Sequence, residues 1–317
     1  ATGCTTPSAS AIAAAQPTCI SSTPEANPYL SHPLSSAARN IYLNSFTNPS
    51  GARQEALLQL GRNTEHWSDK VDIAIDENNM VRIVITYLDP ILVEYIVLNY
   101  LLNAPYTPNG SSNVTSTPMS LDRFDYELSE TLRKLGGRNE MLFAVTITTP
   151  FYREQAFNSN VLNVRIPIKE LALISGSDMR VVPTHDDHIL EENIDITHGP
   201  VSGIVGYPIA VLNQEQCIWI TDAYTTTLTL DVPRVILGST EFGSQFWSIP
   251  YRSLVMQDNS QPSLTYDNNY TNPISDLEKP PTPNWKPNAE TDDTIWSLYW
   301  EQMGRYLWNQ VITESHH

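Results

Sequence analysis

The spacing of apolar residues divides the chain into a first part with helical patterns and a second part with strand patterns. Residues 121–135 carry Phe124, Leu128 and Leu132 at the spacing that places them on one face of a helix. From Met141 onward, short apolar runs follow one another with turn residues between them. We therefore predict an α+β protein that is mainly β, with an antiparallel β-sandwich core and flanking helices.

The segment before this helix contains two further patterns. Residues 35–60 favour a helix that is broken around Asn48. Residues 71–87 alternate between apolar and polar positions on either side of a polar turn, which predicts a β-hairpin. The first part of the chain is therefore expected to be a helical and hairpin region.

The most apolar stretch, residues 91–104, follows directly on Asp89-Pro90. Asp is a preferred helix cap and Pro is favoured in the first turn, so this dipeptide indicates a helix start. The stretch is too short to span a membrane and carries Glu94, which predicts a buried core element. Its β-branched residues leave a strand as the alternative.

Composition divides the chain into five expected segments. They are a disordered tether rich in Ser, Thr, Ala and Pro (1–30), a helical and hairpin region (31–140), an antiparallel β-sandwich (141–256), a Pro-rich linker (257–292) and a C-terminal amphipathic helix (293–315). Whether 31–256 forms one domain or two is left open by the sequence.

The C-terminal helix is expected to carry an unusual number of aromatic side chains. An aromatic helix behind a long linker must be buried against something, either a protein partner or its own sandwich. The candidate partner-binding residues are Trp296, Tyr299, Trp300, Tyr306 and Trp308.

The three cysteines lie at positions 4, 19 and 217. Gly3-Cys4 behind small residues resembles the end of a bacterial lipobox, and this resemblance implies that Cys4 is lipidated. The flexible composition that follows suits a tether behind a lipid anchor. In an oxidising compartment Cys19 and Cys217 could form a disulfide; otherwise both are free thiols, with Cys217 packed as a small hydrophobic residue.

The formal net charge of −17 argues against binding to nucleic acid or to anionic lipid surfaces. Contact with a membrane is therefore expected only through a lipid anchor. A protein partner or a glycan remains compatible with the charge.

Residues 184–199, THDDHILEENIDITHG, form the one short stretch that looks like a metal site. His185, Asp187, His188 and His198 are ligand types that zinc accepts, and the carboxylates suit calcium equally well. The alternative is a solvated acidic loop that runs into a strand. No cofactor is expected unless this stretch binds zinc or calcium.

Motifs of nucleophilic catalysis, nucleotide binding and zinc proteolysis are absent from the sequence. The chain is therefore expected not to be an enzyme. Trp219 and Trp247 lie in predicted strands, where we expect them to pack in the core.

Together these patterns predict a non-catalytic, extracytoplasmic binding or assembly protein of the bacterial cell surface, either lipid-anchored or secreted. One alternative is a carbohydrate-binding β-sandwich that uses exposed Tyr and Trp side chains. The other is a metal-dependent hydrolase centred on residues 184–199.

Overall fold

The computed structural model of the chain describes residues 27–76, 79–103, 121–148, 163–174, 180–186, 190, 193–196, 201–213, 216–221 and 225–251. The expected linker and the expected C-terminal helix lie outside these ranges, as does nearly all of the expected tether.

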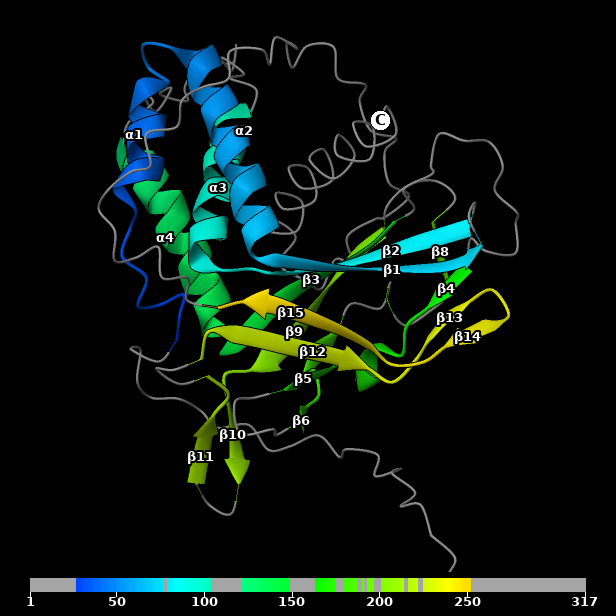
Figure 1. Cartoon of the computed structure of the whole chain (residues 1–317). Helices are drawn as coiled ribbons and strands as arrows, with labels where there is room; N and C mark the ends of the chain where they lie inside the picture. Colours follow the sequence, from blue (N-terminus) through cyan, green and yellow to red (C-terminus); the bar gives the residue numbers. More distant parts are fainter. Residues whose placement is uncertain are drawn as a thin grey trace, which may run out of the picture.

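Four α-helices lie in the described part of the chain, and Figure 1 shows them grouped on one side of the strands. They are α1 (Ser36–Asn44), α2 (Pro49–His66), α3 (Pro90–Asn103) and α4 (Leu121–Gly137). None of them combines the length and apolar character that crossing a bilayer requires.

The predicted break in the first helical stretch separates α1 from α2. The Ser35 hydroxyl accepts hydrogen bonds from the amides of Ala37 and Ala38 and so caps α1. The Asn48 side chain accepts a hydrogen bond from the Gly51 amide at 3.1 Å and caps α2. Each helix therefore starts at a residue whose side chain satisfies amides in its first turn.

α3 is a helix and not a strand, and its neighbours surround it. Every side chain from Leu92 to Asn99 is buried. α4 has the opposite character, with one buried face that contains Phe124, Leu128, Leu132 and Leu135. The amphipathic pattern predicted α4 directly, whereas α3 shows no polar face because it lies inside the helical layer.

Fifteen strands complete the described fold. They are β1 (Ser68–Asp76), β2 (Asn79–Tyr87), β3 (Glu140–Thr148), β4 (Asn163–Arg165), β5 (Ala172–Ile174), β6 (Arg180–Val181), β7 (His185–Asp186), β8 (Ile194–Asp195), β9 (Val201–Pro208), β10 (Ala210–Asn213), β11 (Gln216–Trp219), β12 (Thr227–Val232), β13 (Val235–Leu237), β14 (Thr240–Phe242) and β15 (Gln245–Pro250).

The strands form four antiparallel sheets. Their orders are β1-β2-β3-β9-β7, β15-β12-β5-β6, β14-β13-β4-β8 and β10-β11. The predicted hairpin is β1–β2, and the predicted α+β class with antiparallel, sandwich-like sheets is confirmed.

The largest sheet joins the hairpin to strands from the later part of the chain. β2 pairs with β3, and β3 pairs with β9, so the sheet extends across residue 140, where the sequence suggested a boundary. Trp247 on β15 is buried and donates a hydrogen bond to the Ile83 carbonyl on β2 at 3.2 Å. The second sheet thereby contacts the first, and one continuous apolar core serves both.

One carboxylate lies in the core of the second sheet. The Asp231 side chain on β12 is only 7% exposed, and its Oδ2 accepts a hydrogen bond from Arg180 on the edge strand β6 at 2.6 Å. The other oxygen, Oδ1, is buried, and no described residue forms a hydrogen bond with it. Arg180 is therefore the group that compensates the buried charge.

Replacing Arg180 by Met should lower the free energy of unfolding by about 2–3 kcal/mol, because Asp231 would stay buried without its counter-charge. Urea unfolding measures this loss. The matched control is Arg133→Met, which removes an exposed ion pair with Glu130 and should cost less than about 1 kcal/mol. Equal losses in the two variants would show that Asp231 does not depend on Arg180.

Candidate functional site

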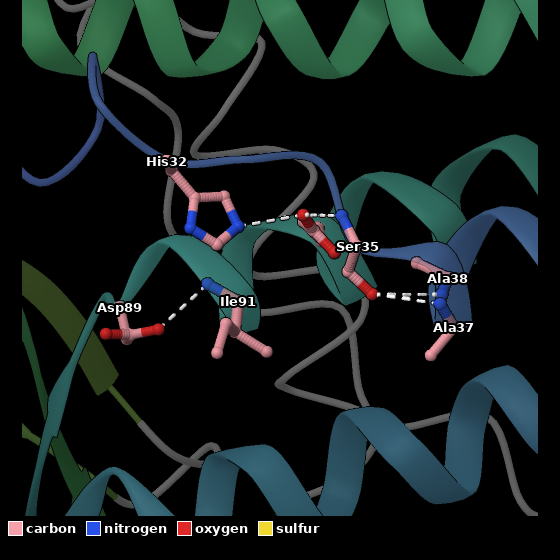
Figure 2. A network of polar contacts seen from close by, with 7 residues as sticks. His32, Ser35, Ala37, Ala38, Asp89 and Ile91 are labelled. Carbon is pink, nitrogen blue, oxygen red and sulfur yellow. Dashed lines mark hydrogen bonds and ion pairs between the residues drawn. The ribbon is translucent and has the colours of Figure 1, made fainter. Parts of the chain in front are cut away.

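A buried histidine–glutamate pair lies where the segment Asn27–Ser35 crosses α3. Glu94 is fully buried on α3, and the His32 side chain is only 7% exposed. The Nε2 atom of His32 donates a hydrogen bond to Oε1 of Glu94 at 2.8 Å. Figure 2 shows the His32 ring lying between the chain that carries it and the start of α3.

Glu94 also holds the backbone of the same segment. The Ser35 amide donates to Oε1 of Glu94 at 2.8 Å, so two donors of the segment share one carboxylate oxygen. The second oxygen, Oε2, is buried and has no hydrogen-bond partner among the described residues. Because this carboxylate is buried and the hydrogen bonds go to one of its oxygens, losing either donor would lower the stability of the protein.

The segment Asn27–Ser35, which we name the strap, has further attachments. The Tyr29 hydroxyl donates to the Leu88 carbonyl at 2.8 Å, and the Asn27 side chain donates to the Gly136 carbonyl at 2.8 Å. A Cβ atom on Gly136 would come within 2.5 Å of the Leu30 side chain, so the strap fits closely against the end of α4. The strap thus connects the start of α3 to the end of α4.

Asp89 completes the cluster at the start of α3. Its Oδ1 accepts a hydrogen bond from the Ile91 amide at 2.8 Å, as expected of a helix cap (Figure 2). The pKa of Asp89 is raised to about 6, mainly by burial and also by the nearby Glu94 charge, against the opposing effects of the Ile91 amide and His32. Asp89 therefore changes its charge within the pH range that proteins commonly meet.

The geometry of this cluster suits a structural contact that holds the strap on α3 better than it suits nucleophilic chemistry. The hydroxyl of Ser35 accepts hydrogen bonds from two α1 amides and serves as a helix cap. Its backbone amide, and not its hydroxyl, contacts Glu94. The groups are thus arranged to hold the strap on α3.

The predicted metal site is only partly within the described residues. Asp187, His188 and His198 lie outside them, and the described backbone places His185–Asp186 in β7, at the edge of the largest sheet beside β9. Among the described residues, no three side chains of His, Cys, Asp or Glu gather at a distance suited to a metal ion.

The beginning of that stretch is bound to the sheet. The Thr184 amide donates to the Gly206 carbonyl at 2.8 Å, and the Thr184 hydroxyl donates to Glu140 at 2.7 Å. Thr184 is thus held at the sheet just before β7, because the sheet supplies the partners that its amide and hydroxyl need.

A second candidate site is the hairpin β10–β11, which projects away from the helices in Figure 1. Cys217 on β11 is exposed and disulfide-bonded. Trp219, two residues further on, is 37% exposed, so the expectation that it packs in the core is wrong. The matching expectation for Trp247 is confirmed, since that side chain is 1% exposed.

The other sequence candidates lie outside the described residues. These are the lipidation candidate Cys4, the disulfide candidate Cys19 and the aromatic residues Trp296, Tyr299, Trp300, Tyr306 and Trp308.

Comparisons of the chain with protein-family models, with curated proteins and with solved structures found no match.

Sequence reasoning missed the cluster around Glu94. It treated Glu94 as an interruption of an apolar run, although a lone carboxylate inside a buried helix must find a donor. That requirement was a usable signal that a distant polar group packs there. It did not identify His32, which lies 62 residues away along the chain.

Replacing His32 by Ala should lower the free energy of unfolding by about 2–3 kcal/mol, because Glu94 would lose one of its two donors while remaining buried. The matched control is His66→Ala, at an exposed position at the end of α2. Thermal and urea unfolding of both variants measure the difference. A loss no greater than that of the control would show that the His32–Glu94 contact adds nothing to stability.

Proposed function

We propose that the protein is an extracytoplasmic binding or assembly protein of the bacterial cell surface, anchored by a lipid on Cys4 or secreted. The observation that carries this proposal is the disulfide at Cys217. Disulfides persist in oxidising compartments outside the cytoplasm and are rare inside it. A structural disulfide therefore supports a location beyond the cytoplasmic membrane.

A binding role is supported by the position of Trp219. This side chain is exposed on a hairpin that projects from the body of the protein (Figure 1). Tryptophan is enriched at the centres of protein interfaces, where a large apolar surface and one polar N–H serve together. The hairpin is thus the described surface that best suits contact with a partner.

A carbohydrate ligand is the second candidate, because an exposed indole ring can also stack on a sugar. Glycan binding would quench tryptophan fluorescence and would be lost in a Trp219→Ala variant. A protein partner would instead give a covalent adduct of discrete mass when a photo-cross-linking amino acid replaces Trp219.

The photo-cross-linking experiment tests the proposed function in the cells that produce the protein. A photo-reactive residue at position 219 of the full chain should yield one adduct of discrete mass at the cell surface. The matched control position is Tyr126 on α4, which is 65% exposed and should yield none. Deleting residues 293–313 should reduce the adduct if the C-terminal helix contributes to the same association.

Two results would contradict the proposal. One is a chain that remains in the cytoplasm with a free Cys217 thiol. The other is a chain at the surface that gives neither an adduct at position 219 nor glycan-dependent quenching. Circular dichroism of the variant lacking residues 293–313 must show retained structure, because unfolding would assign the C-terminal segment a structural role instead.

We also propose that Cys19 is the partner of Cys217, because a sulfur that carries a lipid at Cys4 cannot also form a disulfide. Formation of the bond removes two protons and two electrons from the thiols, and a disulfide oxidant of the extracytoplasmic space accepts them. Cys4 and Cys19 lie outside the described residues, and no Lys or Arg separates them, so one tryptic peptide contains both.

Mass spectrometry of the alkylated, unreduced Cys4→Ser chain resolves the assignment. We expect the tryptic peptide that contains Cys19 and ends at Arg39 to remain linked to the Cys217 peptide, with neither cysteine alkylated. A free Cys217 thiol in this variant, but not in the unaltered chain, would instead assign the bond to Cys4 and exclude lipidation of that sulfur.

A further inference from the structure

The largest sheet turns one of its two faces toward the second sheet. The Tyr207 hydroxyl on β9 donates to the Leu171 carbonyl beside β5 at 2.8 Å. The centre of the Tyr87 ring on β2 lies 5.7 Å from that of Tyr251, which follows β15. Because side chains alternate along a strand, every second residue of β2, β3 and β9 points away from the second sheet.

The residues that point away form a buried surface that is rich in threonine, which we name the threonine face. The register places Val84 opposite Thr146, and Thr146 opposite Ser202, so these side chains share one face. The members on the three strands are Val84, Thr86, Ala144, Thr146, Thr148, Ser202 and Ile204. None of them is more than 9% exposed, so the face is covered.

The described helices and strands do not account for this cover. α3 begins just after β2 and α4 ends just before β3, and Figure 1 shows the helices gathered at that end of the sheet. At the rise of a β-strand, Thr146 lies about 20 Å from Glu140, where β3 starts. No described helix runs closely along β2, β3 or β9. β13 continues from β12, and its sheet lies on the side of β12 and β15 (Figure 1).

The chemistry of the face calls for an apolar cover with large side chains. The hydroxyls of Thr146 and Ser202 are hydrogen-bonded to each other at 2.9 Å, and those of Thr86 and Ser68 at 2.6 Å. The sheet thus satisfies these polar groups itself and presents methyl groups outward. Small side chains on one surface pack best against large ones on the other.

We propose that the C-terminal segment 293–313, which lies outside the described residues, packs as a helix on the threonine face. At helical spacing its apolar stripe consists of Trp296, Trp300, Met303 and Leu307. These large side chains complement the small ones of the face. The residues between Tyr251 and this segment can extend over more than about 100 Å, so the connection reaches the face easily.

Other parts of the chain outside the described ranges suit the face less well. Residues 1–26 and 104–120 are mainly small or polar and carry no comparable apolar stripe. Residues 149–162 contain Phe151, Tyr152 and Phe157 and are the main rival. They connect β3 to β4, however, and β4 pairs with β13 on the side of the second sheet, so their path leads away from the threonine face.

This inference is independent of the proposed function, because the hairpin β10–β11 projects elsewhere (Figure 1). Trp300 faces the protein itself, and Trp219 remains the aromatic side chain offered to a partner. Without the C-terminal segment the strands keep their backbone partners and their contact with the second sheet. Its loss should therefore lower the stability of the protein without abolishing the fold.

A benzophenone amino acid in place of Trp300 tests the packing in the full chain. On illumination it should link the chain to itself, and mass spectrometry of tryptic peptides should place the link within 84–86, 144–148 or 202–204. The matched control position is Gln302, which lies on the opposite side of the expected helix and should give no link to these residues.

Urea unfolding provides a second measurement that needs no cross-link. Trp300→Ala should lower the unfolding midpoint by about 1 M, because a large side chain is lost from a packed contact. Gln302→Ala should leave the midpoint nearly unchanged.

Three outcomes would overturn the proposal. The first is a cross-link from position 300 to another protein, which would make the segment an arm that binds a partner. The second is a position 300 that forms no link to the threonine face. The third is an equal midpoint for Trp300→Ala and Gln302→Ala.

Discussion

The burial of α3, whose side chains from Leu92 to Asn99 are all buried, is the constraint on which the helical layer depends. A helix that is apolar on every side can exist in water only if other elements cover it, and α1, α2, α4 and the strap do so. Its buried polar side chains Glu94 and Asn99 must then find partners inside the protein. Glu94 accepts a hydrogen bond from the Ser35 amide of the strap, and Asn99 donates to the Ala56 carbonyl of α2 at 2.9 Å. The polar residues of α3 therefore fix which neighbours surround it.

The same constraint gives the strap its character. The strap is held by polar contacts inside the protein, because the buried Glu94 carboxylate accepts hydrogen bonds from the His32 ring and from the Ser35 amide. Asp89, which caps α3, lies close enough to Glu94 for the Glu94 charge to raise its pKa. Asp89, which starts α3, and Glu94, the buried carboxylate that needs donors, thus lie close together at one end of the helix.

The hairpin β10–β11 relates to the body of the protein in a different way. Its strands pair only with each other within the described residues, and it exposes Trp219. A two-stranded hairpin has little stability of its own, so a covalent bond at Cys217 and contacts of neighbouring residues with the core can hold it in place. An exposed aromatic side chain on a stabilised projection is available to a partner at a small entropic cost.

The sequence by itself determined the elements whose signals are local. The α4 stripe, the break near Asn48, the Asp89 cap, the β1–β2 hairpin and the run of later strands follow from periodicity and from residues next to each other. Only the tertiary structure decided which strands pair across residue 140, that Trp247 is buried while Trp219 is exposed, and that His32 meets Glu94. The physical reason is that these contacts join residues far apart in the chain. Their pairing is selected by the burial of the whole core, which no local pattern encodes.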